Sequence, residues 1–574
     1  MVDAGAVSEA VDVPVMVDVP AVTVSGRWAM AYSSEALDGA TRAALAAEAV
    51  STDTDRAPEA AFVLGRRLPV EDLLTVAATL PRQSLVAFAR GVVGRAPPSA
   101  PREVGRFREL LRAADGLPVV AEIVSRFRLP LAVEDLPLVE RFLASSDLTE
   151  QCAGARLLDA PNAPMPSPLV LAGLHPVALA LASRALHRRN AVPSALWTTT
   201  LDHVSARALA NPRAWGNALL ALVDAVPSAD PFVRERVIAL PEAMNPVALE
   251  PASVAAAFRC AIARRADALD NADRTSRCAT GPERWRSVIA RVERLGDAPT
   301  PELLTALLNE APDDLRVQAA IAQRLVTLTP GAARPLLIRF AQSNDPGVLA
   351  AFLESLALHV QHARAIPPAA RTALLQRPFE LPEPVSLEAR LQSIRVQRAL
   401  GMSPTVPASA VRAIRAEANP DAAVTPATVS GEEAIAARIR LETTAGTFVV
   451  AFDPHTAPAA VRTMVEAARA HTYDGTPFHR VVPGFVAQGG DPRGDGYGGV
   501  SAITPTELSG ATFDRGSVGV ALAGLDTGGS GFFVVLADTP HLDGQYPFVG
   551  RVIEGMSSVD RLMVGDTIIR ATVE

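Results

Sequence analysis

The residues of this 574-residue chain that could do chemistry gather near its C-terminal end. Arg480, Phe485 and Gln488 lie within nine residues of one another, around the turn-forming pair Pro483-Gly484. The aromatic and branched residues of 478–482 and 485–488 predict two short strands around a tight turn. Such a hairpin would place a permanently charged donor, an aromatic ring and an amide close together.

This segment resembles the cyclophilins, a family of peptidyl-prolyl isomerases. Three sequence blocks carry the resemblance, in the family's order and within the last quarter of the chain. They are Phe478-His-Arg480, Pro483-Gly-Phe485 and Gln488-Gly-Gly-Asp491; Ala521 with Gly529-Ser-Gly-Phe-Phe533; and Leu542-Asp-Gly544 with Phe548-Val-Gly-Arg-Val552. The resemblance implies an eight-stranded antiparallel β-barrel closed by two helices over residues 433–574.

The resemblance also implies an enzyme that accelerates rotation about X-Pro peptide bonds. The barrier to this rotation is about 20 kcal/mol because the C–N bond has partial double-bond character. A donor that reaches the prolyl nitrogen only in the twisted state lowers the barrier by differential binding. Arginine suits this role because it stays charged and presents several donors in a rigid fork. We assign the role to Arg480, and we expect neither a metal nor a cofactor.

The other site residues follow from the same resemblance. Gln488 is expected to hold the substrate backbone and to steady the arginine. Phe485, Phe533 and Leu542 are expected to form an apolar pocket for the proline ring. The predicted substrate-binding set is completed by Val486, Ala521, Leu522, His541 and Tyr546, of which Ala521 and Leu522 would act through their backbone.

Several positions depart from the family's usual pattern. Val486 replaces a methionine, Leu522 an asparagine, Gly531 a glutamine, and His541 a tryptophan or phenylalanine. Gly531 removes a polar partner near the arginine, and His541 changes the pocket rim. These two changes motivate an alternative function: a scaffold whose barrel binds proline-containing segments without accelerating their isomerisation.

The first 401 residues have a different pattern. Residues 1–35, rich in Val, Asp and Pro near the start, predict an extended tail. Residues 36–401 show helical spacing of apolar residues almost throughout. Proline, which costs no hydrogen bond at the first helical position, marks six predicted helix starts, and the polar residue before it can cap the helix. These prolines are Pro176, Pro212, Pro231, Pro251, Pro301 and Pro346.

The spacing of these starts, about 20 residues or twice that, predicts an α-solenoid similar to HEAT repeats. An irregular all-helical domain is the alternative. Residues 402–432 are rich in Pro and Ala and predict a linker. The chain is therefore expected to be a multidomain protein with an α-helical repeat region before the barrel. The expected partners are proline-containing peptides or unfolded clients, with a further protein partner on the helical region.

Composition excludes several function classes. The net charge of −8 argues against nucleic acid as a partner. The sequence contains no run of 18 apolar residues, so no membrane span is expected. Every basic residue is arginine, which excludes Schiff-base catalysis and a Walker-type phosphate loop. Together with the bias towards Ala, Val and Pro, the lack of lysine suggests a GC-rich bacterial gene.

The three cysteines, Cys152, Cys260 and Cys278, predict buried free thiols. A pair between Cys260 and Cys278 is the alternative in an oxidising compartment. The first residues lack the basic and apolar regions of a signal peptide, so the chain as given predicts a cytoplasmic protein. The bacterial cell envelope is the alternative if a leader was removed or missed.

Overall fold

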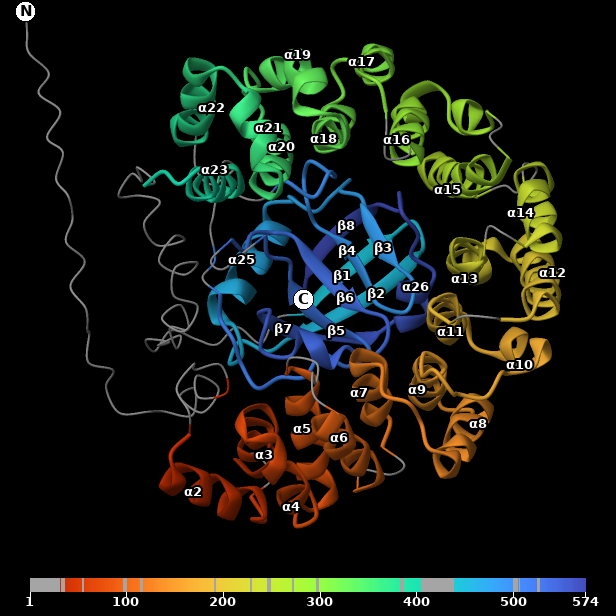
Figure 1. Ribbon diagram of the computed structural model, residues 1–574, viewed down its shortest axis with the longest axis vertical. Helices are drawn as coiled ribbons and strands as arrows, with labels where there is room; N and C mark the ends of the chain where they lie inside the picture. Colours follow the sequence, from red (N-terminus) through yellow and green to blue (C-terminus); the bar gives the residue numbers. More distant parts are fainter. Residues whose placement is uncertain are drawn as a thin grey trace, which may run out of the picture.

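The computed structural model describes residues 31, 37–53, 56–95, 101–113, 117–189, 192–227, 230–244, 249–270, 273–295, 299–381, 387–403, 438–498, 504, 506–523 and 527–574. The predicted linker lies almost wholly outside these residues, and so does nearly all of the predicted N-terminal tail. In Figure 1 the helices before residue 400 form an arc, the helical arc, that curves around a central barrel formed by residues 438–574.

The helical arc is built of helices that pack mainly against helices near them in the sequence. Its helices are α2 (Gly39–Ala49), α3 (Arg56–Arg67), α4 (Leu73–Ala77), α5 (Arg82–Val93), α6 (Pro101–Ala113), α7 (Val119–Phe127), α8 (Leu136–Ala144), α9 (Leu148–Leu157), α10 (Pro168–Gly173), α11 (Pro176–His187), α12 (Ser194–Ala210), α13 (Pro212–Ala225), α14 (Pro231–Met244), α15 (Ala252–Asp270), α16 (Arg284–Arg294), α17 (Pro301–Glu310), α18 (Leu315–Arg324), α19 (Pro330–Phe340), α20 (Pro346–Leu358), α21 (Val360–Ala365), α22 (Pro368–Glu380) and α23 (Leu387–Ala399). The predicted all-α fold class of this region is confirmed.

The proline signals locate helix starts well. Five of the six predicted helices begin at the predicted proline, and α15 begins one residue after Pro251. The preceding side chains cap the first turn as expected: Asn211 accepts from the backbone N–H of Ala214, and Thr300 from that of Leu303. Local chemistry therefore determines where these helices begin.

The barrel is an eight-stranded antiparallel sheet, as predicted. Its strands are β1 (Arg438–Thr443), β2 (Gly446–Phe452), β3 (Arg480–Val482), β4 (Val486–Gly489), β5 (Ser517–Val520), β6 (Phe532–Val535), β7 (Phe548–Glu554) and β8 (Ile568–Val573), in the order β3-β4-β6-β5-β7-β2-β1-β8. Helices α25 (Pro458–Arg469) and α26 (Met556–Asp560) accompany them. Phe448, Phe478 and Phe532 fill the barrel interior with aliphatic neighbours.

Ion pairs join the helical arc to the barrel at widely separated places. Arg90 of α5 forms a bidentate pair with the buried Asp543, with N–O distances of 2.6 and 3.0 Å. Arg213 of α13 pairs with the buried Asp566 at 2.7 Å. Near the other end of the arc, Asp345 caps α20 and also pairs with an arginine of a barrel loop, Arg493, at 2.8 Å. The barrel is therefore fixed to the arc through charges that face one another across the contact.

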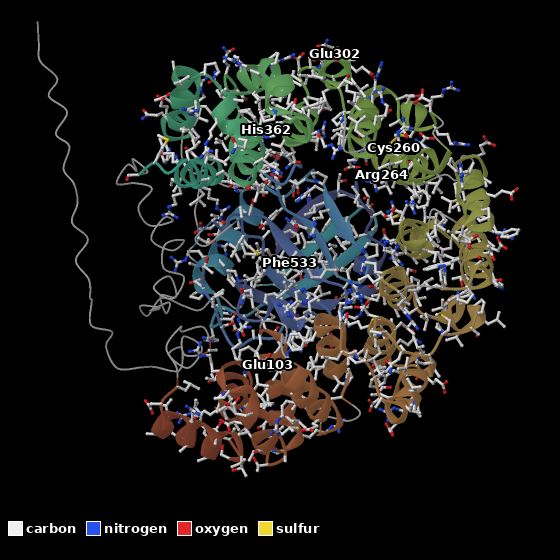
Figure 2. All side chains as sticks on the ribbon, viewed as in Figure 1. Glu103, Cys260, Arg264, Glu302, His362 and Phe533 are labelled. Atoms are coloured by element: carbon white, nitrogen blue, oxygen red, sulfur yellow. A yellow bond between two sulfur atoms is a disulfide. The ribbon has the colours of Figure 1, made fainter. Side chains whose placement is uncertain are left out.

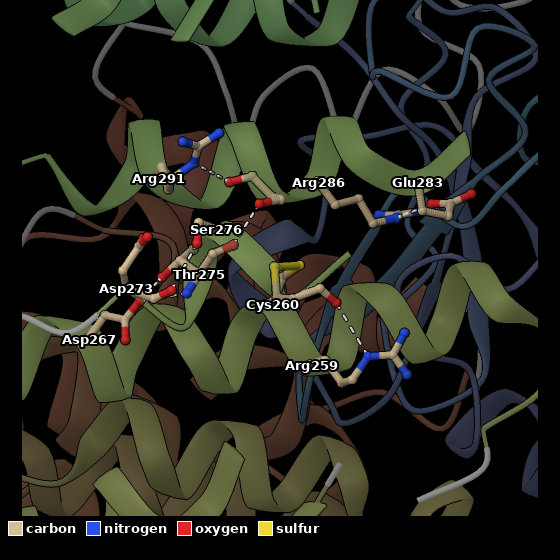
Figure 3. The surroundings of a disulfide bond; sticks show 11 residues. Arg259, Cys260, Asp267, Asp273, Thr275, Ser276, Glu283, Arg286 and Arg291 are labelled. Carbon is tan, nitrogen blue, oxygen red and sulfur yellow. Dashed lines mark hydrogen bonds and ion pairs between the residues drawn. A yellow bond between two sulfur atoms is a disulfide. The ribbon is translucent and has the colours of Figure 1, made fainter. Parts of the chain in front are cut away.

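The prediction of free thiols is wrong for two of the three cysteines. Cys260 of α15 and Cys278 form a disulfide, with their Cα atoms 4.9 Å apart (Figure 3). The turn between them is held because the buried Asp267 accepts the backbone N–H of Thr275. Cys152 is a buried free thiol, as expected.

Candidate active site

The hairpin formed by β3 and β4 brings the predicted catalytic pair together. Arg480 lies directly opposite Gln488, and its Nη1 atom donates to Gln488 Oε1 at 3.4 Å. The turn between the strands depends on Gly484, whose φ of 69° is left-handed. A Cβ atom added to it would lie 2.8 Å from the side chain of Leu181 on α11, so a larger residue would collide there. The guanidinium carbon of Arg480 is 5.8 Å from the centre of the Phe485 ring, within cation–π range.

Cross-strand pairing places the site on the outer face of the barrel. Gln488 lies opposite Phe533 on β6, and Phe533 lies opposite Gly519 on β5. Residues directly opposite share one face of a sheet. Their sequence neighbours Ala487 and Phe532 belong to the barrel interior, so the row from Arg480 to Phe533 faces outward. A Cβ atom on Gly519 would lie 2.5 Å from the Phe533 ring, which shows that the glycine makes room for that ring.

A second apolar cluster, separate from the barrel-interior cluster, surrounds Phe533, which lies in the central barrel (Figure 2). Its buried members are Val486, Phe513, Phe533, Val535, Leu542 and Phe548, and Phe485, Ala521 and Tyr546 pack against them. Tyr546 meets Phe533 edge to face, with ring centres 5.5 Å apart. We call this cluster the apolar slot. Six of the predicted pocket residues therefore share one place.

Leu522 is the predicted pocket residue whose side chain lies elsewhere. It packs against the barrel-interior cluster and not against the apolar slot. The prediction for this position concerned its backbone, which is compatible with that placement. At Gly531, where the family has a glutamine, Ala521 is the one described residue that an added Cβ would meet within 4 Å.

His541 forms the side of the slot that faces the helical arc. Its ring stacks on Phe485, with centres 5.5 Å apart and planes inclined by 21°. Its Nδ1 atom lies 3.2 Å from Glu122 Oε1 of α7, and the other carboxylate oxygen pairs with Arg156 of α9 at 2.8 Å. Burial opposes the charge on Glu122, but Arg156 and His541 outweigh it and hold the pKa of that carboxyl below its usual value. The helical arc therefore reaches the rim of the slot.

Sequence reasoning missed the residues that support the slot from outside it. Phe513 lies between Phe533 and Phe548, at 5.6 and 5.8 Å from their ring centres. Glu122 and Arg90 come from helices about 400 residues away in the chain. A glutamate or an arginine on an amphipathic helix is usually solvated, so no local signal could have singled them out.

His479, beside Arg480, has both ring nitrogens buried without a hydrogen-bond partner among the described residues. Burial lowers the pKa of its ring, so the neutral form is favoured. Within the described parts of the chain no group of three or more His, Cys, Asp or Glu residues is placed to hold a metal ion. The helices described include none that is long and apolar enough to cross a membrane.

Comparisons with known proteins find relatives of the barrel region. A family model described as "Cyclophilin type peptidyl-prolyl cis-trans isomerase/CLD" matches residues 438–572. A peptidyl-prolyl cis-trans isomerase of Helicobacter pylori is 45% identical over 116 residues, which are 20% of this chain and 71% of the relative. Peptidyl-prolyl cis-trans isomerase B of Bacillus subtilis is 41% identical over 123 residues, or 21% of this chain and 86% of the relative.

Eukaryotic proteins match as well, among them the mouse peptidyl-prolyl cis-trans isomerase-like 1, with 38% identity over 138 residues, which are 22% of this chain and 81% of the relative. A crystal structure of a cyclophilin type isomerase from Cryptosporidium parvum matches with a TM-score of 0.23 and 26% identity, over 24% of this chain and 96% of that chain. The bacterial origin suggested by composition therefore stays a prediction.

Proposed function

The chain belongs, through residues 438–572, to the family of cyclophilin type peptidyl-prolyl cis-trans isomerases, and we propose that Arg480 and the apolar slot carry its reaction. The protein is an enzyme of the peptidyl-prolyl cis-trans isomerase class. The observation that supports our assignment of residues is the row of Arg480, Gln488 and Phe533 on one face of three neighbouring strands.

In this proposal the slot holds the proline ring while the preceding carbonyl rotates. Phe533 and Leu542 offer a largely buried apolar surface, and Phe485 closes one side of it. Arg480 is exposed, and its contact with Gln488 orients the guanidinium beside Phe485. As the X-Pro bond twists, the prolyl nitrogen recovers its lone pair and accepts a hydrogen bond from the arginine. That bond forms only in the twisted state, so it lowers the barrier without tightening ground-state binding.

We further propose that the chain divides into a helical region of residues 36–401, with HEAT-like repeats, a linker of residues 402–432 and an isomerase domain of residues 433–574. The helical region would bind clients or a protein partner. The contacts of α7 with His541 and of α11 with Gly484 support a client-binding role of the helical region, because they bring the arc to the edge of the slot. A client bound on the arc would then lie close to Arg480.

The disulfide bears on the compartment. Disulfides persist in oxidising environments such as the bacterial periplasm and are rare in the cytosol. We therefore propose the cell envelope, the second of the two compartments considered from the sequence. Thiol labelling of the protein, taken directly from its cells and unfolded without reductant, tests this. One reactive thiol per chain, that of Cys152, is expected; three reactive thiols would indicate a reducing compartment.

The scaffold function remains the second candidate because Gly531 and His541 depart from the family pattern at the slot. Two measurements on one proline-containing peptide separate the candidates: binding by fluorescence anisotropy, and cis/trans exchange by NMR. An isomerase binds the peptide and accelerates exchange. A scaffold binds it and leaves the exchange rate at the uncatalysed value.

A further inference from the structure

A cavity of about 690 Å³ lies between the helical arc and the barrel. Helices α11, α13, α15 and α16 line it on one side, through residues such as Leu220, Ala257 and Ile289. Val481, Val482 and Pro483 of the hairpin line it on the other side. Arg264 and Cys260, which also line it, lie on the arc where the arc faces the barrel (Figure 2). The volume is within the range of ligand-binding pockets, and the lining is mostly apolar.

The cavity is held open by contacts at its edge. Asn217 of α13 donates to the carbonyl oxygen of Leu562 at 2.7 Å, and the guanidinium of Arg184 on α11 donates to the carbonyl oxygen of Pro483. These bonds tie both walls together without filling the space between them. The cavity is therefore a fixed feature of the contact between arc and barrel.

Four arginines line the cavity, and three of them are matched by acids. Arg188 pairs with Asp159, Arg264 with Glu293, and Arg286 with Glu283. Arg184 differs: the partner found for it among the described residues is the carbonyl oxygen of Pro483, and no carboxylate of these residues lies within 4 Å. Burial, together with the nearby cations Arg156 and Arg188, lowers the pKa of Arg184 to about 10. A largely buried cation next to other cations favours an anionic partner from outside.

The cavity is also next to the candidate active site. The residues from Val481 to Pro483 that form its wall lie between Arg480 and Phe485 in the same hairpin. One hairpin therefore borders both the slot and the cavity, and a client whose proline occupies the slot needs a spacer to reach the cavity. An apolar lining with one cation lacking a carboxylate partner selects an apolar segment with an acidic side chain.

We propose that this cavity is a second binding site for the client chain, which takes an apolar segment carrying one carboxylate and places that carboxylate on Arg184. The site deepens the proposed function, on which it rests, by naming the substrate class. Clients would be recognised by two elements: a proline for the slot, and an apolar, acidic segment next to it in the sequence. Linking the two elements in one chain raises the effective concentration of the second for its site.

The experiment uses the full chain and a series of fluorescent peptides. Each peptide joins an Ala-Pro unit, through a glycine-serine spacer of varied length, to a segment of leucine, phenylalanine and one glutamate. A matched series carries glutamine in place of the glutamate. We expect the wild type to bind the glutamate peptide about ten- to a hundredfold more tightly than the glutamine peptide at the best spacer length.

The Arg184→Gln variant supplies the decisive comparison. It is expected to bind both peptides equally, because the preference for glutamate depends on this one cation. A ratio between two peptides on the same variant is insensitive to a general loss of folding or of slot geometry. Should Arg184→Gln fail to fold, Ala257→Leu narrows the cavity from α15 and should weaken binding of both spacer-linked peptides relative to Ala-Pro alone.

Three results would overturn the proposal. They are equal binding of the two peptides by the wild type, a preference for glutamate that survives Arg184→Gln, and a preference that appears only after residues 1–27 are deleted. The last would assign the cavity to this chain's own acidic N-terminal segment. Failure of the proposed function would be visible separately, since Arg480→Ala would then leave the exchange rate of every peptide unchanged.

Discussion

Replacing Arg90 by methionine is expected to loosen the barrel from the helical arc. The guanidinium is buried and bonds to both oxygens of Asp543, and it also pairs with Asp514 at 2.7 Å. Burial opposes the charge on Arg90, but these two carboxylates outweigh it and hold its pKa above the usual value. Methionine keeps much of the length and removes every donor, so Asp543 would stay buried without its cation.

The magnitude follows from the cost of an uncompensated buried charge, about 3–5 kcal/mol when one partner of such a pair is removed. Since about 1.4 kcal/mol is a factor of ten, local opening at this contact should become roughly a hundred to several thousand times more frequent. The amide of Phe513 donates to Asp543 at 2.8 Å and reports on that opening. Hydrogen exchange of the peptide that contains it, measured by mass spectrometry, gives the opening free energy.

Two further variants make the test strict. Arg236→Met breaks the ion pair between Arg236 and Asp202, two side chains that are both about half exposed. It should change the rate of hydrogen exchange at Phe513 by less than about fivefold. The double variant Arg90→Met/Asp543→Asn removes both charges of the pair, so it should accelerate hydrogen exchange at Phe513 less than Arg90→Met alone does. If Arg90→Met accelerates exchange at Phe513 no more than Arg236→Met does, the reasoning from the buried pair is refuted.

The remaining predictions concern Glu122, Glu388 and the disulfide. Glu122→Gln should raise KM for proline peptides several-fold with little change in kcat, because His541 loses its anionic partner; a fall in kcat alone would contradict this. The pKa of Glu122 lies below its ordinary 4.5, so its ion pairs stabilise the fold fully above pH 4.5, and this stabilisation is lost as the pH falls through the pKa of the folded state. Glu122→Gln should therefore lose less stability than the wild type on acidification, as measured by the midpoints of urea unfolding. Burial raises the pKa of Glu388 to about 8, so with respect to this group the protein is most stable below the ordinary pKa of 4.5 and loses stability as the pH rises to about 8. Glu388→Gln should therefore melt at a higher temperature than the wild type near pH 8.5 and at the same temperature near pH 4. Equal melting temperatures of variant and wild type at both pH values would refute the shift. Replacing Cys260 and Cys278 by alanine should destabilise the helical arc by about 2–4 kcal/mol in urea unfolding followed by tryptophan fluorescence; an unchanged midpoint would mean that the disulfide contributes nothing.

The parts of the structure that depend on local chemistry could be predicted. Proline after a capping residue marked the starts of α13 and α17, and Pro483-Gly484 marked the hairpin turn. Each of these signals acts within a few residues. The strand predicted over 478–482 begins only at Arg480, because Phe478 turns into the barrel interior.

What depends on distant contacts could not be predicted. The disulfide was predicted as free thiols, because spacing alone does not show that a turn held by Asp267 brings Cys278 back to α15. The contact of Glu122 with His541 joins residues 419 positions apart, and nothing in the sequence around Glu122 indicates that contact. The packing of the Leu522 side chain against the barrel interior likewise depends on tertiary contacts.

The central claim, that the Arg480 guanidinium lowers the rotational barrier, is tested most directly by NMR exchange on a short Ala-Pro peptide. Wild type, Arg480→Ala and Arg480→Lys are compared at equal concentrations of folded protein. We expect Arg480→Ala to lose about a hundredfold or more in kcat/KM with nearly unchanged peptide affinity, and Arg480→Lys to recover only part of it, since one ammonium lacks the rigid fork. Equal exchange rates for wild type and Arg480→Ala would contradict the account.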